Sequence, residues 1–234
     1  MRVVIADDSI LFRHLLAEVL SALPDVEVVG HASNGRLAVR KVCELEPDLL
    51  TLDMEMPEMD GLSVLDALRS SCKMPAVIVV SALTRQGGRL TIQALQKGAF
   101  DFITKPDDAS AEKNRSALSA ALAPKIKALS LRLGVRSILR GRPEVDPAKA
   151  VAESNARQPA SDLTSVGERM CRLSGIGKPE LVLIGVSTGG PTALEVLLSK
   201  LPPSLGVPVL IVQHMPPVFT QSLAENLDSK SRLK

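Results

Sequence analysis

Carboxylates, a hydroxyl and a lysine each stand directly after a short apolar run in the first half of the chain. Asp7 and Asp8 follow the first run, and Asp53, Ser81 and Lys105 follow later ones. Carboxylates held close together repel each other unless a cation or a proton joins them. Hard oxygen ligands suit Mg²⁺, which also accepts a phosphate, and lysine supplies a positive charge for phosphoryl oxygens. The set predicts phosphoryl transfer onto a carboxylate, with a metal ion offsetting the charge.

Taken alone, each of these residues has a simpler interpretation. Asp53 fits a solvated loop aspartate that caps the next turn about as well as it fits a reactive site, when only residues 49–61 are considered. Ser81 fits a helix cap, and Lys105 fits a surface lysine. The pattern becomes specific only when the strand ends are combined in the order Asp-Asp, Asp, Ser and Lys-Pro.

These side chains meet only if the apolar runs are parallel strands of one sheet. Five runs have the length and the turn-rich flanks of buried strands: residues 2–6, 26–30, 49–53, 76–80 and 99–104. Amphipathic segments between them predict helices, and the alternation predicts a doubly wound α/β fold with a parallel sheet. The paired glycines at 87 and 88 predict a mobile loop, and Pro124 predicts a kink or a break in the helix that follows the sheet.

Residues 1–125 resemble the receiver domain of two-component response regulators. The resemblance implies that Asp53 is the phosphoacceptor and that Ser81 and Lys105 contact the phosphoryl group. Phe102 stands three residues before Lys105, where receivers place a rotating aromatic side chain. The resemblance also implies a Mg²⁺ site formed by three carboxylates and one backbone carbonyl, those of Asp7, Asp8, Asp53 and Glu55.

A second pair of reactive side chains follows two apolar runs in the last part of the chain. Ser187 lies in Gly-Val-Ser-Thr-Gly-Gly-Pro after residues 181–184, and His214 follows residues 207–212. A serine on a tight strand-to-helix turn is typical of a nucleophile, and a histidine on the next strand end is placed to take its proton. The local motif also fits a glycine-rich phosphate cradle. The nucleophile is favoured, because a dinucleotide turn needs glycine near position 187 and an acidic residue for the ribose.

The receiver, the linker and the two motifs together closely resemble the chemotaxis protein-glutamate methylesterase family. The resemblance implies that Ser187 is the nucleophile and His214 the general base. It implies hydrolysis of glutamate methyl esters, and often deamidation of glutamines, on methyl-accepting chemoreceptors. It also implies that a chemotaxis histidine kinase phosphorylates Asp53 and thereby moves the receiver off the esterase cleft.

Three segments are predicted: a receiver domain at 1–125, a helix end and interdomain linker at 126–177, and the start of a second doubly wound α/β esterase domain at 178–234. Catalytic domains of this family continue well beyond the histidine, and their triad aspartate lies downstream, so we expect an incomplete esterase domain. Glu225 and Asp228 fall in the helix predicted after His214 and receive no role. The alternative function is a receiver-only binding module or phosphate sink with an inactive effector remnant.

Composition excludes several other classes of protein. The net charge of +2 says little about partners, and the chain has no long basic stretch. It has no Trp, no Tyr and four Phe, which argues against base-stacking platforms, so we expect no nucleic-acid partner. The three cysteines form no zinc or disulfide pattern. The apolar runs are strand-sized, which predicts no membrane insertion, and the first strand begins within two residues of the start, without room for a signal peptide. We expect a cytoplasmic protein.

Overall fold

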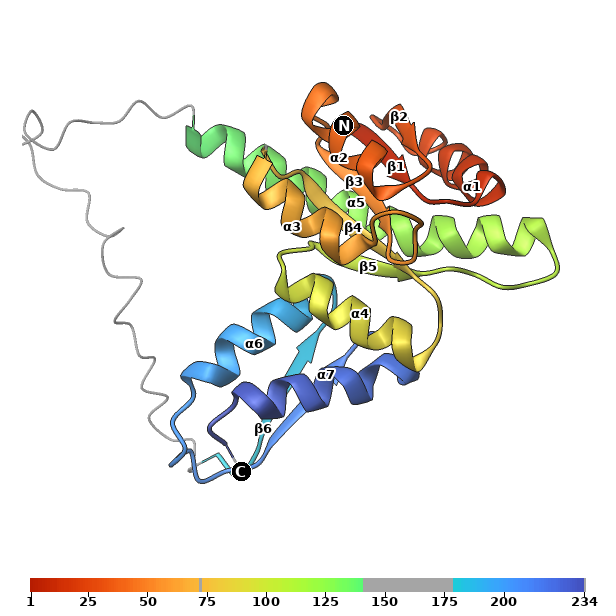
Figure 1. Ribbon diagram of the computed structural model, residues 1–234. Coiled ribbons are helices and arrows are strands. Elements are labelled where there is room, and N and C mark those ends of the chain that lie inside the picture. Colours follow the sequence, from red (N-terminus) through yellow and green to blue (C-terminus); the bar gives the residue numbers. More distant parts are fainter. Residues whose placement is uncertain (72, 141–178, 234) are drawn as a thin grey trace, which may run out of the picture.

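A computed structural model describes residues 1–71, 73–140 and 179–233, and its first half is built on a five-stranded parallel sheet (Figure 1). The strands follow the order β2-β1-β3-β4-β5 across the sheet. Their bounds are β1 (Arg2–Ala6), β2 (Glu27–Ala32), β3 (Leu49–Asp53), β4 (Ala76–Ser81) and β5 (Asp101–Thr104). All four neighbouring pairs are parallel. The predicted doubly wound fold is confirmed.

Helices cover both faces of this sheet, which explains why its strands are apolar along their length. Packed against one face are α1 (Ile10–Ser21) and α5 (Ala111–Arg140). Against the other face lie α2 (Gly35–Leu45), α3 (Gly61–Ser71) and α4 (Arg85–Gln96). Every residue of β3 is buried. Polar side chains at the strand ends therefore gather at one edge of a sheet whose central strand is fully buried.

The strand register brings the predicted site residues to the same edge. Ala6 pairs with Leu52, Asp53 with Val80, and Ser81 with Thr104. The residues that follow these strands, or end them, therefore lie at similar heights on neighbouring strands.

The glycine pair at 87 and 88 belongs to the first turn of α4, so the predicted loop is wrong. Thr84 caps the helix by accepting a hydrogen bond from the Gly87 N–H at 2.9 Å. A Cβ at position 87 would lie 2.3 Å from the Ala82 carbonyl oxygen. These glycines mark close packing rather than a flexible segment.

After the sheet, α5 is one helix with Pro124 inside it, and it extends to Arg140, beyond the apolar repeat seen in the sequence. Residues 141–178 of the predicted linker lie outside the described residues, so the three domain boundaries stay predictions. No helix in the described part of the chain is long and apolar enough to cross a bilayer.

The last described segment begins a second α/β unit, as predicted. Two parallel strands, β6 (Val182–Val186) and β7 (Val209–Gln213), alternate with α6 (Gly190–Lys200) and α7 (Pro217–Lys230). Both helices pack on one face of the pair. The other face is open: Leu183 is 67% exposed and Val212 is 62% exposed.

The two halves of the molecule meet along α4 and α7, which run side by side (Figure 1). The buried stripe of α7 joins the core formed by the α2–α4 face of the first sheet. It consists of residues one helical turn apart, Phe219, Leu223 and Leu227. The first and second halves of the molecule therefore share one continuous apolar core.

Candidate functional site

A half-buried lysine bridges two carboxylates at the edge of the five-stranded sheet. Lys105 Nζ lies 2.7 Å from Asp53 Oδ2 and 2.8 Å from Asp7 Oδ2. Asp7 has no exposed surface and Asp53 is 2% exposed. The ammonium group therefore offsets most of the repulsion between two charges that are both removed from water.

Backbone groups fix the orientation of both carboxylates. The Ser9 N–H donates to Asp7 Oδ1 at 2.9 Å, and the Glu55 N–H donates to Asp53 Oδ1 at 3.3 Å. Arg13, which no sequence pattern had indicated, donates from Nη1 to the carbonyls of Asp7 and Asp8 at 2.6 and 3.0 Å. Its place four residues after a helix cap carried no signal for this contact.

Burial raises the pKa of Asp53 from 3.8 to about 6, against the opposing effect of Lys105. Burial by itself would lower the pKa of Lys105, but its contacts with Asp53 and Asp7 outweigh burial and raise that pKa. The carboxyl group of Asp53 is thus a more basic nucleophile than an exposed aspartate, and it faces a lysine that stays protonated.

Asp7, Asp8 and Asp53 bring carboxylate oxygens within 4.8 Å of one another. Two of the three are buried and Asp8 is exposed. The buried Asp7 Oδ2 has the Lys105 ammonium group as its charged partner at 2.8 Å. Hard oxygen donors open to solvent on one side fit a divalent cation such as Mg²⁺.

Ser81 is 1% exposed and reaches the same edge from β4. Its hydroxyl donates to the Gly87 carbonyl of α4 at 3.1 Å. Phe102 on β5 is buried beside α4 and α7, and its ring lies 5.4 Å from the ring of Phe219. The sequence-predicted hydroxyl and aromatic are therefore both in contact with elements that link the two halves.

Ser187 and His214 follow the two strands of the second sheet. Val186 pairs with Gln213, so the serine and the histidine stand at the ends of adjacent strands. Both are exposed. In the described part of the chain, no hydrogen bond joins the Ser187 hydroxyl to the His214 ring. The strand register thus brings Ser187 and His214 to one edge of the two-stranded sheet, but it does not orient their side chains toward each other.

Gln213 holds these two segments together, a role that was not predicted from the sequence. Its Nε2 donates to the Ser187 carbonyl at 3.0 Å and to the His214 carbonyl at 3.3 Å. A Cβ at Gly190 would lie 2.2 Å from Gln213 Oε1. The sequence did contain a signal for this role, because Gln213 is a polar residue at the end of an otherwise apolar strand.

In the described part of the chain, neither of the two acidic residues that follow His214 forms a hydrogen bond with it. Glu225 lies in α7 and accepts a hydrogen bond from Gln221 Nε2 at 2.9 Å. Asp228 lies in the same helix. Their placement in α7 agrees with the sequence-based expectation, and no triad acid is assigned.

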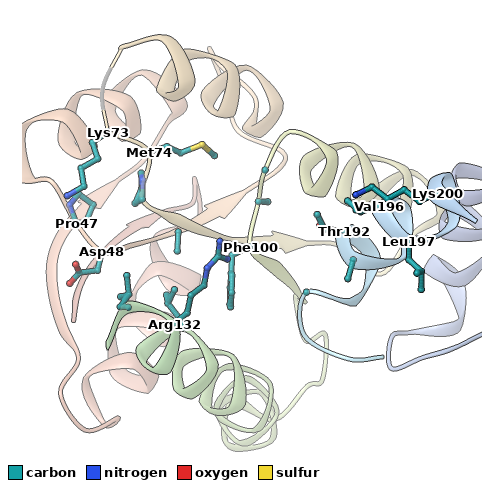
Figure 2. Close-up of a pocket in the computed structure, with 18 residues that line it drawn as sticks. Pro47, Asp48, Lys73, Met74, Phe100, Arg132, Thr192, Val196, Leu197 and Lys200 are labelled. Carbon is teal, nitrogen blue, oxygen red and sulfur yellow. The ribbon is translucent and has the colours of Figure 1, made fainter. Parts of the chain in front are cut away.

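A cavity of about 1240 Å³ lies between α6 and the opposite end of the five-stranded sheet (Figure 2). Arg132 lies over the Phe100 ring at 5.7 Å on one side of it, and Val196 and Lys200 of α6 line the other. Phe100 precedes β5, so the cavity is at the amino ends of the strands. Ligand chemistry in such sheets occurs at the carboxyl ends, and the cavity is separate from Asp53.

Two family models match the chain. The model for the response regulator receiver domain matches residues 3–115, and the model for CheB methylesterase matches residues 182–234. A crystal structure of the response regulator domain of Thermotoga maritima CheB is 39% identical, with a TM-score of 0.49; the match covers 55% of this chain and 95% of that one.

Two curated relatives carry the same name, protein-glutamate methylesterase/protein-glutamine glutaminase. The protein from Desulfotalea psychrophila is 41% identical over 234 residues, which is 100% of this chain and 62% of the relative. The protein from Nocardioides sp. is 42% identical over 229 residues, which is 97% of this chain and 58% of the relative. The chain thus spans about three fifths of the length of these relatives.

Proposed function

Because the chain belongs to the family of response regulators that join a receiver domain to a CheB methylesterase domain, we propose that it is a phosphorylation-controlled hydrolase. Its substrates are glutamate methyl esters on methyl-accepting chemoreceptors, and glutamine side chains that it deamidates. The observation that carries the proposal is the presence of two candidate sites on one chain, at Asp53 and at Ser187, with a shared apolar core between them.

In the receiver half, an oxygen of Asp53 attacks the phosphorus of a phosphodonor. The donor is the phosphohistidine of a chemotaxis kinase, or an acyl phosphate. The bond from phosphorus to the donor breaks, and the donor leaves with the electron pair. Lys105 and Ser81 then contact the transferred phosphoryl group. A bound Mg²⁺ would offset the phosphoryl charge, held by the carboxylates and carbonyl of Asp7, Asp8, Asp53 and Glu55.

In the second half, the Ser187 hydroxyl attacks the ester carbonyl while His214 takes its proton. The bond to the methoxy group breaks, and methanol leaves with that proton. Water then attacks the acyl-serine, and glutamate is released. With a glutamine substrate the leaving group is ammonia. Gln213 supports this step by holding the backbones of both strand ends at one edge.

Control of the second site by the first is supported by the packing of α4 against α6 and α7. In this arrangement the receiver half covers one side of the second half. We propose that phosphorylation of Asp53 loosens the contact and exposes the esterase site to the receptor.

The test is methanol release from methylated chemoreceptor fragments, with and without acetyl phosphate and Mg²⁺. We expect release that rises with phosphorylation and disappears in both Ser187→Ala and His214→Ala. Ser199→Ala is the matched control, because Ser199 is an exposed serine of α6 whose hydroxyl donates to the Val196 carbonyl of the same helix. Release that persists in Ser187→Ala would refute the proposed nucleophile.

A second function, a receiver-only module or phosphate sink, is favoured by one observation. Ser187 and His214 are exposed and not hydrogen-bonded to each other in the part of the chain that the structure describes. This function predicts phosphorylation that is lost in Asp53→Asn, together with methanol release no higher than in Ser187→Ala.

A further inference from the structure

The ammonium group of Lys105 lies over the face of an aromatic ring, in addition to its contacts with two carboxylates. Its Nζ is 5.1 Å from the centroid of the Phe12 ring. The carboxylates are those of Asp53 and Asp7. A cation over a ring is attracted by the negative charge of the ring face. In the described part of the chain, these three groups are the partners of the ammonium group.

Phe12 is held in place by the helix that carries it. It lies in the first turn of α1, and its N–H donates to Oγ of the capping residue, Ser9, at 3.3 Å. Its side chain is half-buried and packs against the core on the α1–α5 face of the sheet. Its neighbours Ile10 and Leu11 are instead exposed to solvent. The position of the ring beside Lys105 is thus fixed by both the helix cap and the core.

The ring differs from the two carboxylates in how phosphorylation affects it. Asp53 is the proposed phosphoacceptor and Asp7 is a proposed ligand of Mg²⁺, so both carboxylates bind new partners during the reaction. Each then has less charge left to attract the ammonium group. An aromatic face offers no oxygen ligand to a hard cation and no hydrogen-bond donor to a phosphoryl oxygen. Among the three partners, the ring is the one that loading the site leaves unchanged.

We propose that Phe12 is a positioning residue for phosphoryl transfer, whose ring holds the Lys105 ammonium group at the reacting edge while both carboxylates bind new partners. The inference rests on the proposed function and adds a residue to its first step. Lysine needs such a hold because its charge sits on a flexible stem, and the Lys105 side chain is 26% exposed. Without the ring, the ammonium group turns toward water while Asp53 attacks phosphorus.

Fluorine atoms on the ring test this electrostatic contact and leave the shape of the side chain almost unchanged. Each fluorine withdraws electron density from the ring face and so weakens its attraction for a cation. The full chain is prepared with Phe12→difluorophenylalanine and Phe12→trifluorophenylalanine, and treated with Mg²⁺ and acetyl phosphate. An oxygen of Asp53 attacks phosphorus, and acetate leaves with the electron pair of the broken bond. Intact mass measures the rate of phosphorylation.

We expect this rate to fall stepwise with the number of fluorine atoms, by about two- to fivefold with three of them. Phe12→Leu keeps an apolar side chain without a ring face, and its rate should fall at least as far. Phe12→Tyr keeps an electron-rich ring and should stay near the wild-type rate. A residue that served only in packing would give a rate that does not depend on fluorine number.

Phe100 provides the matched control, because it is a second ring that lies beside a cation. Arg132 lies over it at 5.7 Å. Phe100 precedes β5, at the amino ends of the strands and away from Asp53. Phe100→trifluorophenylalanine should therefore weaken a comparable contact and leave the rate of phosphorylation unchanged.

A spectroscopic measurement reports the contact without phosphoryl transfer. Protons held over an aromatic face resonate upfield, so the Cε protons of Lys105 should be shifted upfield in the metal-free chain. The signal is identified by its absence in Lys105→Met. The shift should disappear in Phe12→Leu. In the wild-type chain it should persist with Mg²⁺ and beryllium fluoride, which mimics the phosphoryl group.

Three results would overturn the proposed role of Phe12. These are a rate independent of fluorine number, an equal fall in Phe100→trifluorophenylalanine, and loss of the Lys105 shift when Mg²⁺ and beryllium fluoride are added. If the wild-type chain gains no more phosphate than Asp53→Asn, the proposed function itself fails. If the chain is phosphorylated at the same rate whatever the ring carries, only the role of Phe12 fails.

Discussion

The carboxyl edges of both sheets carry candidate reactive side chains, which are buried in the first sheet and exposed in the second. At the edge of the five-stranded sheet, Asp53 is buried, bridged by Lys105 and held by a backbone N–H. At the edge of the two-stranded sheet, Ser187 and His214 are open to solvent. Strand order brings candidate residues together at both edges. Only the five-stranded sheet, whose central strands have a neighbour on each side, also shields these side chains from water and orients them.

The two faces of the two-stranded sheet also differ in their exposure to water. α6 and α7 bury one face, while Leu183 and Val212 on the other face meet water. Parallel sheets are normally covered on both faces. The contrast indicates that reactive groups at a strand end acquire their properties from neighbouring layers, beyond what the motif supplies.

The largest loss of stability is expected for a substitution on the face of the two-stranded sheet that α6 and α7 cover. Leu194→Ala removes a side chain of α6 that is 1% exposed, which should cost about 2–5 kcal/mol. Leu183→Ser, on the open face, should change stability by no more than about 0.5 kcal/mol. Hydrogen exchange of α6 and β6 measures both. Equal costs would mean that the open face is buried in solution.

The next effect concerns the lysine bridge. Lys105→Met leaves two buried carboxylates without their cation and removes a contact to the phosphoryl group, so the rate of phosphorylation by acetyl phosphate should fall about 10²-fold. Lys97→Met is the control, because Lys97 pairs with Asp66 on the surface of the same half. An unchanged rate in Lys105→Met would show that burial, and not the ion pair, prepares the site.

The buried edge of the five-stranded sheet should make the stability of the protein depend on pH. The folded pKa of Asp53 is raised from 3.8 to about 6, so the folded state holds a proton that the unfolded state has lost. Stability should therefore fall as pH rises between these values, by up to about 3 kcal/mol. Urea unfolding in metal-free buffer measures the loss. Asp53→Asn should remove it, and a slope that survives in this variant would assign it to another group.

The smallest expected effect lies in the Ser187 turn. Gly190→Ala places a Cβ 2.8 Å from that of Val186 and 2.2 Å from Gln213 Oε1, which should cost about 1–3 kcal/mol. A Cβ at Gly185 meets nothing within 4 Å, so Gly185→Ala should stay within about 0.5 kcal/mol. Urea unfolding compares the two. The reverse ranking would mean that the Gln213 bridge does not position this turn.

Much of the fold could be predicted from local pattern. Apolar runs such as 49–53, with polar residues at their ends, predicted the strands, the parallel sheet and the candidate site edge, because strand burial and strand order leave few other arrangements. The candidates Asp53, Ser81, Lys105, Ser187 and His214 were all identified from the sequence. The roles of these residues stay predictions.

Contacts between distant segments could not be predicted. The glycine pair at 87 and 88 predicted a loop, because an isolated sequence does not show that Ala82, Ser81 and Phe219 occupy the space of the missing side chains. Gln213 and Arg13 were missed for the same reason, since their hydrogen bonds form only once strands and loops have come together.

The amino-acid sequence thus specified which reactive groups stand at strand ends, since local periodicity fixes the strands and covalent order fixes the residues after them. Tertiary structure alone decided which groups are buried, paired and coupled. Asp53 gained its raised pKa from burial by neighbouring strands and helices, and Phe219 met Gly88 although the two lie far apart in the chain. Desolvation and close packing depend on atoms brought from distant segments, and no local pattern encodes them.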